Sequence, residues 1–220
     1  MMNKTIIDPR HWDNYAAQHL RVSTRFQQVV YETTAQGMSG QVVDFGCGSG
    51  KITTYLASNA RVSAYTGVDC SPEMLQVAQW LLDALAQPHF ELCLSKIDDL
   101  RKCGFDSGLS INSYYAWAKP QHTLRKIAAS LKGGGVFVLV TPNPRLDMSL
   151  LLEEASKELI AHPDFALFRE QNLAFARHYK DTFVSMDQLI AQTRDAGFEI
   201  EHCHCDFYLG GMNYLRMRKA

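Results

Sequence analysis

The feature that most restricts the fold is a glycine-rich segment between a short apolar run and a helical pattern. The run QVVDF (41–45) is apolar and β-branched, GCGSG follows at 46–50, and KITTYLAS continues with helical spacing. A strand, a glycine loop and a helix in this order present backbone N–H groups to a nucleotide-like ligand. The segment therefore predicts an α/β fold with a ligand site where this strand ends.

The alternation of strand and helix patterns continues along the chain. Further strand patterns lie at 64–69, 89–94, 107–112 and 136–141, with helical patterns at 72–86 and 121–131 and a glycine triplet, Gly133 to Gly135, expected to break the chain. Such units are right-handed βαβ crossovers, which build a parallel sheet with helices on both faces. Helical patterns at 146–161, 164–178 and 185–196 then precede strands at 199–207 and 212–219. Because the last connection is short, these two strands must be antiparallel.

We therefore expect a doubly wound, mostly parallel seven-stranded sheet with an antiparallel terminal strand. At roughly 150 residues per domain, 220 residues indicate a single domain over 1–220. An N-terminal helix is expected over 9–36, because apolar residues there recur at helical spacing. The segment 142–184 interrupts the regular alternation, and we interpret it as a helical lid insertion over the site.

Charge and composition restrict the partners. The chain has 22 Lys and Arg against 23 Asp and Glu, so it lacks the basic excess of a nucleic-acid-binding surface. No apolar run approaches the ~18 residues that cross a bilayer. The first residues, MMNKTIIDPRHWD, contain no apolar core of a secretory signal. We expect a soluble, cytoplasmic monomer or homodimer that acts on a small-molecule substrate, with neither nucleic acid nor membrane as partner.

A cluster of two histidines and two cysteines, HCHC at 202–205, could suggest a metal site. In a strand the two His would share one face and the two Cys the other, because alternate side chains point in opposite directions. A zinc site takes four ligands from at least two segments, and the sequence has no second cluster of this kind. We therefore favour a structural role for this cluster and expect no metal.

Spacing separates three known types of glycine loop. The dinucleotide motif GxGxxG needs a third glycine where the chain has Lys51. The phosphate loop GxxxxGK[ST] needs four residues between its glycines, whereas three separate Gly46 from Gly50. What remains is DxGxGxG, formed by Asp44, Gly46, Gly48 and Gly50. An acidic residue here would repel a pyrophosphate but suits an ammonium group, which indicates an amino-acid nucleoside.

The second strand pattern ends in Asp69, 19 residues after Gly50, about the distance at which a carboxylate reaches ribose hydroxyls. On VVDFGCGSG and GVDCSPEML, the sequence resembles the class I S-adenosylmethionine (SAM)-dependent methyltransferases of the small-molecule type. FDSGLSINSYYAW resembles the fourth-strand motif of that family, and LRKIAASLKGGGVFVLVT its helix, glycine turn and fifth strand. WDNYAAQHL resembles its N-terminal helix, so the resemblance spans roughly 11–141 and, through the terminal strand pair, most of the chain.

The resemblance implies SAM as the cofactor. Asp69 would bind the ribose, and Met74 would pack on the adenine. The family's acidic residue after the third strand is replaced by Lys96, so either Asp98 or backbone groups near Ile97 would hold the adenine amino group. The full set of expected cofactor contacts is Tyr15, Asp44, Gly46, Cys47, Gly48, Gly50, Asp69, Cys70, Met74, Ile97, Asp98, Asn112 and Ser113.

Methyl transfer from a sulfonium is an in-line displacement, in which alignment supplies most of the acceleration and a general base is optional. The acceptor is expected between residues 112–117, the N-terminal helix and the 142–184 insertion. Candidate catalytic side chains are Tyr115, Tyr179 and His122. The aromatic ring of a tyrosine could contact the sulfonium, because a π face favours a cation. The aromatic residues could equally be core residues. For His122 a surface position is the simpler interpretation.

Two other functions use the same cofactor site. In the first, the α-amino group of the methionyl part displaces methylthioadenosine and closes a small ring, as in enzymes that make azetidine-2-carboxylate. In the second, the protein binds SAM without catalysis and acts as a sensor or scaffold. Product analysis with SAM alone separates these functions, because ring closure releases methylthioadenosine whereas a methyltransferase needs an acceptor.

Overall fold

The computed structural model describes residues 21–220, so Tyr15 and most of the first half of the expected helix 9–36 lie outside the described residues. Helix α3 spans Arg25–Gln36 and begins with a capping box. Thr24 has an extended backbone and its side chain accepts a hydrogen bond from the Gln27 amide, while the Gln27 side chain accepts one from the Thr24 amide. One continuous helix over 9–36 is therefore wrong, because a capping residue cannot itself be helical.

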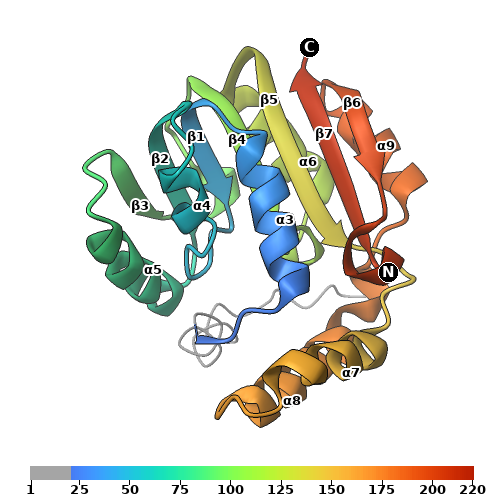
Figure 1. The fold of residues 1–220 in the computed structure, drawn as a ribbon. Helices are drawn as coiled ribbons and strands as arrows, with labels where there is room; N and C mark the ends of the chain where they lie inside the picture. Colours follow the sequence, from blue (N-terminus) through green and yellow to red (C-terminus); the bar gives the residue numbers. More distant parts are fainter. Residues whose placement is uncertain (1–20) are drawn as a thin grey trace.

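A seven-stranded sheet forms the centre of the described part of the chain (Figure 1). The strands are β1 Gly40–Phe45, β2 Val62–Asp69, β3 Phe90–Leu94, β4 Phe105–Ile111, β5 Leu131–Pro142, β6 Phe198–His204 and β7 Met212–Lys219. Their order is β3-β2-β1-β4-β5-β7-β6. The first five pair in parallel, and β7 is antiparallel to both β5 and β6. The expected doubly wound sheet with an antiparallel terminal strand is confirmed.

Helices cover the sheet on two faces, and each face has its own core. Besides α3, the helices are α4 Thr53–Ala57, α5 Pro72–Leu85, α6 Pro120–Ser130, α7 Met148–Leu159, α8 Phe165–Tyr179 and α9 Met186–Asp195. Successive strand residues point to opposite faces, so Val43 and Phe45 enter one apolar cluster and Val42 enters the other. None of the helices within residues 21–220 combines the length and the apolar character that crossing a membrane requires.

The glycine triplet does not break the chain before the fifth strand. Strand β5 runs through Gly133–Gly135 and absorbs them as an irregularity in its pairing with β4. The register shifts between Phe105, which faces Leu131, and Ser107, which faces Val136. Gly134 has φ +71°, a conformation that glycine adopts without a steric penalty. The glycines therefore form a bulge inside the strand.

Helices α7 and α8 form a small layer of their own, below the ends toward which β1 and β5 point (Figure 1). Their contact is a separate apolar cluster that includes Leu152, Ala155, Phe165 and Phe168, together with the fully buried Val22 from the segment before α3. This placement puts the pair over the carboxyl ends of the parallel strands, where open α/β sheets bind their ligands. The interpretation of 142–184 as a lid stays a prediction.

Candidate functional site

A cavity of about 830 Å³ lies between the carboxyl ends of the strands and helices α7 and α8, and we call it the site cavity. Its volume falls in the range of about 300–1,000 Å³ that is typical of small-molecule sites. The end at the sheet is formed by the glycine loop and the segments after β2, β3 and β4. The end at α7 and α8 is mostly apolar and is lined by Met148, Leu151, Leu152, Ala155, Phe168, Gln171, Asn172, Ala174, Phe175 and His178.

The three glycines after β1 have different roles, although all have positive φ. A Cβ on Gly46 would lie 2.5 Å from the Cβ of Ser113, so only glycine lets the loop approach the end of β4. A Cβ on Gly48 would meet nothing closer than 3.8 Å and would project at the site cavity. A Cβ on Gly50 would lie 3.2 Å from Ala78 Cβ on α5, and Gly50 does not line the cavity. Gly50 therefore serves the packing of the loop on α5, and its expected ligand contact stays a prediction.

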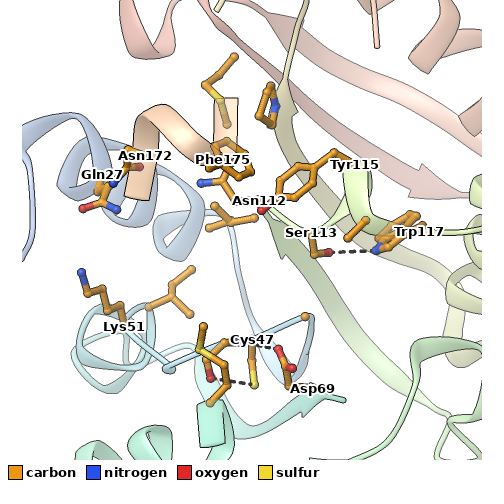
Figure 2. A pocket seen from close by; sticks show the side chains of 18 of the residues that line it. Gln27, Cys47, Lys51, Asp69, Asn112, Ser113, Tyr115, Trp117, Asn172 and Phe175 are labelled. Carbon is orange, nitrogen blue, oxygen red and sulfur yellow. Dashed lines mark hydrogen bonds between the residues drawn. The ribbon is translucent and has the colours of Figure 1, made fainter. Parts of the chain in front are cut away.

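Asp69 ends β2 with its carboxylate at the site cavity, close to Cys47 (Figure 2). Its Oδ2 accepts a hydrogen bond of 2.8 Å from the Gly48 amide, and its Oδ1 accepts one of 2.9 Å from the Ser71 amide. Burial raises the pKa of this carboxyl group, and the backbone donors oppose the rise. Each carboxylate oxygen has two lone-pair directions, so the fixed carboxylate can still accept from two adjacent hydroxyls of a ligand.

Asp44 is a buried carboxyl group below the glycine loop. It is 3% exposed, and Tyr65 Oη donates to its Oδ2 over 3.1 Å. Burial raises the pKa of Asp44 to about 8 despite this hydrogen bond. An ammonium group of a ligand would favour the charged form, so this corner of the site cavity suits a cation. The Cys47 thiol lies beside it, and burial raises the pKa of that thiol well above its ordinary value, which disfavours the nucleophilic thiolate.

The segment after β3 supplies the next wall. Lys96, Ile97 and Asp98 all line the site cavity, as do Cys70 and Met74 at the start of α5. Asp98 Oδ1 accepts a hydrogen bond of 2.7 Å from the Thr123 hydroxyl on α6. This bond orients the carboxylate and leaves its other oxygen for a ligand. Both alternatives for the adenine amino group, Asp98 and the backbone near Ile97, stay open.

The segment after β4 brings three polar or aromatic groups to the site cavity. Asn112 has φ +57°, a strained value for a residue other than glycine, and it turns the chain directly after β4. Ser113 Oγ accepts a hydrogen bond of 3.1 Å from Trp117 Nε1 (Figure 2). Tyr115 lines the cavity, and its ring packs edge-on against Phe175 of α8 at 4.9 Å. The loop after β4 and helix α8 therefore meet over the cavity.

Two of the candidate catalytic side chains do not reach the site cavity. Tyr179 is 2% exposed and packs behind Tyr115, with ring centroids 4.9 Å apart, but it does not line the cavity. Burial raises the pKa of its hydroxyl to about 12. His122 lies on the exposed face of α6 and lines no part of the cavity. Tyr115 is therefore the one of the three that is placed to contact reactants, whereas Tyr179 is packed behind it and His122 lies at the surface. Their catalytic roles stay predictions.

Several cavity residues were missed at the sequence level. Lys51 follows the last loop glycine and lines the cavity, as do Gln27 of α3 and Gln171 and Asn172 of α8. The position of Lys51 next to the loop was a usable signal, whereas the amides on helices carry no local pattern.

In the HCHC cluster the rings of His202 and His204 lie 5.3 Å apart, as neighbours on one face of β6 would. Within residues 21–220, no group of three or more potential metal ligands occurs.

The comparison with known families agrees with this geometry. The sequence profile of a family described as "Methyltransferase domain" matches residues 38–205. The chain belongs to this family. The match begins just before β1 and ends just after β6, so it includes the glycine loop, Asp69, the segment after β4 and both helices α7 and α8.

Curated relatives of this methyltransferase domain are distant. Malonyl-[acyl-carrier protein] O-methyltransferase of Brevibacillus brevis is 25% identical over 140 residues, which are 60% of this chain and 49% of that protein. Fatty-acid O-methyltransferase of Mycolicibacterium smegmatis is 27% identical over 125 residues, 55% of this chain and 44% of that protein. The chain thus spans about half the length of the curated relatives it matches.

Solved structures share the fold of this methyltransferase domain. A SAM-dependent methyltransferase from Aquifex aeolicus superimposes with a TM-score of 0.68 at 13% identity, covering 97% of this chain and 100% of that one. The [4+2]-cyclase SpnF superimposes with a TM-score of 0.65 at 16% identity, covering 88% and 80%. At such identities the likeness concerns the fold alone.

Proposed function

We propose that the protein transfers a methyl group from SAM to an oxygen atom of a small molecule with an apolar body. The observation that carries this proposal is the two-part site cavity. One end combines the glycine loop with the carboxyl groups of Asp44 and Asp69, and the other end is the apolar surface of α7 and α8. Two curated relatives are O-methyltransferases by name, which supports oxygen as the attacked atom.

The residues at the sheet end fit SAM. Asp69 would accept from the ribose hydroxyls, Asp44 would favour the ammonium group, and Gly48 leaves open space into the cavity for close approach to the loop backbone. Met74, Ile97 and Asp98 would surround the adenine. When bound, SAM supplies a methyl group already activated by the sulfonium.

The remaining work of the protein is alignment and exclusion of water. Tyr115 and Asn112 lie at the end of β4, between the cofactor end and the apolar end of the cavity. A π face such as that of Tyr115 favours a sulfonium cation, and its contact with Phe175 orients the ring. An in-line displacement gains mainly from holding the reacting atoms close and collinear. A carboxylate acceptor is already deprotonated at neutral pH and needs no general base.

The experiment is product analysis with SAM labelled in its methyl group and a panel of fatty acids and fatty alcohols of increasing chain length. We expect S-adenosylhomocysteine and a labelled methyl ester or ether only when an acceptor is present. Methylthioadenosine released from SAM alone would replace the proposal by ring closure. SAM binding without turnover on any acceptor would favour a sensor. The Asp69→Asn variant, with a weakened cofactor site, is the control for contaminating activity.

A further inference from the structure

A lysine is buried in the site cavity, and no carboxylate within residues 21–220 pairs with it. Lys51 is 8% exposed and lines the cavity, one residue after the glycine loop. Its Nζ donates a hydrogen bond of 2.5 Å to the backbone carbonyl of Val22. Among residues 21–220 this carbonyl is the one hydrogen-bond partner of the Nζ, and no acidic side chain there pairs with it. An ammonium group has three donors, so two of them have no partner within residues 21–220 and can serve a ligand.

The acidic groups of the site cavity are engaged elsewhere. Asp44 accepts from Tyr65, and Asp69 accepts from the Gly48 and Ser71 amides. Asp98, the third acidic residue among the lining residues of the described chain, accepts from Thr123. Figure 2 shows the Lys51 side chain extending away from Asp69, with its nitrogen on the side of the cavity where Gln27 and Asn172 lie. The lysine therefore does not serve to neutralise the carboxyl groups of the cofactor end.

An apolar cluster lies next to this ammonium group, in addition to the amide side chains on its side of the cavity. Val22, whose carbonyl holds it, is fully buried in the cluster formed with Leu152 and Phe168 of α7 and α8. Burial lowers the pKa of Lys51 to about 8. At pH 7, one unit below that value, the lysine is still protonated in about nine-tenths of the molecules. A cation buried beside a single carbonyl is costly unless a ligand supplies the opposite charge.

We propose that Lys51 binds a carboxylate group of a ligand inside the site cavity. This inference rests on the proposed function and deepens it. Two carboxylates can reach a site next to both the loop and the apolar end: that of an amphipathic acceptor, and that of the methionyl part of SAM. A single ammonium group among amides and apolar side chains suits a singly charged carboxylate, whereas a phosphate calls for more donors.

The test uses isothermal titration calorimetry on the whole chain with Lys51→Met, which keeps the length of the side chain and removes its charge. Lys51→Gln is a second variant, because its amide can still donate to the Val22 carbonyl if Lys51→Met does not fold. Lys126→Met, on the exposed face of α6, is the matched control. The probes are SAM and decarboxylated SAM, and then decanoate and 1-decanol with the protein saturated by S-adenosylhomocysteine.

We expect Lys51→Met to bind one of the two carboxylate ligands about tenfold or more weakly than wild type. Its affinity for the matching analogue without a carboxylate should be unchanged. Loss for SAM but not for decarboxylated SAM assigns the cofactor's carboxylate, and loss for decanoate but not for 1-decanol assigns the acceptor's. If SAM binds wild type and both variants equally and no decanoate binding depends on Lys51, the inference is overturned. Equal losses for the ligands with and without a carboxylate also overturn it, as a purely structural role. Failure of wild type to bind SAM at all would instead refute the proposed function.

Discussion

At the scale of single residues, the site is built from side chains that backbone groups hold in place. Asp69 is the clearest case, because each of its oxygens already accepts one amide hydrogen bond, from Gly48 and from Ser71. These bonds fix the carboxylate before any ligand arrives, so no rotamer entropy is lost on binding. The Ser71 hydroxyl also caps α5 by accepting from the Met74 amide, which joins the ribose-binding candidate to the start of that helix.

Replacing Asp69 should therefore weaken SAM binding without unfolding the protein. Asp69→Asn keeps the shape of the side chain but removes its charge and one acceptor oxygen. We expect a loss of about 1.5–3 kcal/mol in SAM binding, the scale of a hydrogen bond to a charged group. Calorimetry measures the loss, and Asp83→Asn, on the outer side of α5, is the control that should bind normally. Unchanged affinity in Asp69→Asn would show that the ribose lies elsewhere.

At the scale of elements, aromatic packing and one buried valine join the α7–α8 pair to the rest of the described chain. Tyr115 packs against Phe175 and Tyr179 of α8, and Val22 inserts into the cluster between the two helices. The carbonyl of Val22 accepts the Lys51 hydrogen bond, so the segment before α3 links this pair to the glycine loop. A ligand that contacts both the glycine loop and the two helices would add a second connection between them.

Ligand binding should therefore slow amide hydrogen exchange in α7 and α8. In the ligand-free protein we expect opening of 148–179 to cost less free energy than global unfolding, because its apolar cluster is small and separate from the cores of the sheet. SAM or S-adenosylhomocysteine should increase protection there as well as at 46–50. Hydrogen-exchange mass spectrometry of the free and bound protein is the measurement. Equal, strong protection of 148–179 in both states would mean a permanently packed subdomain that does not open as a lid.

At the scale of the whole molecule, two buried groups of the site oppose folding when no ligand is present. The pKa of Asp44 is raised from 3.8 to about 8, and that of Lys51 is lowered from 10.5 to about 8. A raised carboxyl pKa contributes stability that is lost as pH rises from the unfolded value toward the folded one. For Lys51 the pH dependence has the opposite sign. Between pH 8 and 10.5 the lysine is protonated mainly in the unfolded chain, so the free energy of unfolding rises with pH in this range.

The free energy of unfolding of the ligand-free protein should therefore fall between pH 5 and pH 8 through the contribution of Asp44. Urea unfolding of wild type and Asp44→Asn across this range measures it, and the variant should show a smaller fall. Asp106→Asn is the control, because Lys132 holds the pKa of that surface carboxyl below its ordinary value and its effect belongs to lower pH. Parallel pH profiles for wild type and Asp44→Asn would contradict a protonated Asp44 in the folded protein.

Much of this molecule follows from local sequence alone. The β-branched runs, the helical periodicities and the glycine spacing predict a doubly wound, mostly parallel sheet, because alternating strands and helices form right-handed βαβ units. They also bring Asp44, Gly48 and Asp69 together, since the carboxyl ends of neighbouring parallel strands lie at one edge of the sheet. Short-range chemistry sufficed for these residues because each belongs to a strand end or to the turn that follows it.

Only the tertiary structure decided the other half of the site. Tyr179 and His122 have suitable side chains, but the packing of α8 and the exposed face of α6 keep both out of the cavity. Gly50 has the spacing of a ligand contact but faces Ala78, and the local sequence around Lys51 shows only that the loop is not of the dinucleotide type. Whether such a side chain faces a ligand, a core or water depends on helices distant in sequence that pack against it. Those contacts form between segments with no common local pattern, so the surroundings of Lys51 are determined by Val22 and helices α7 and α8 and cannot be derived from its sequence neighbours.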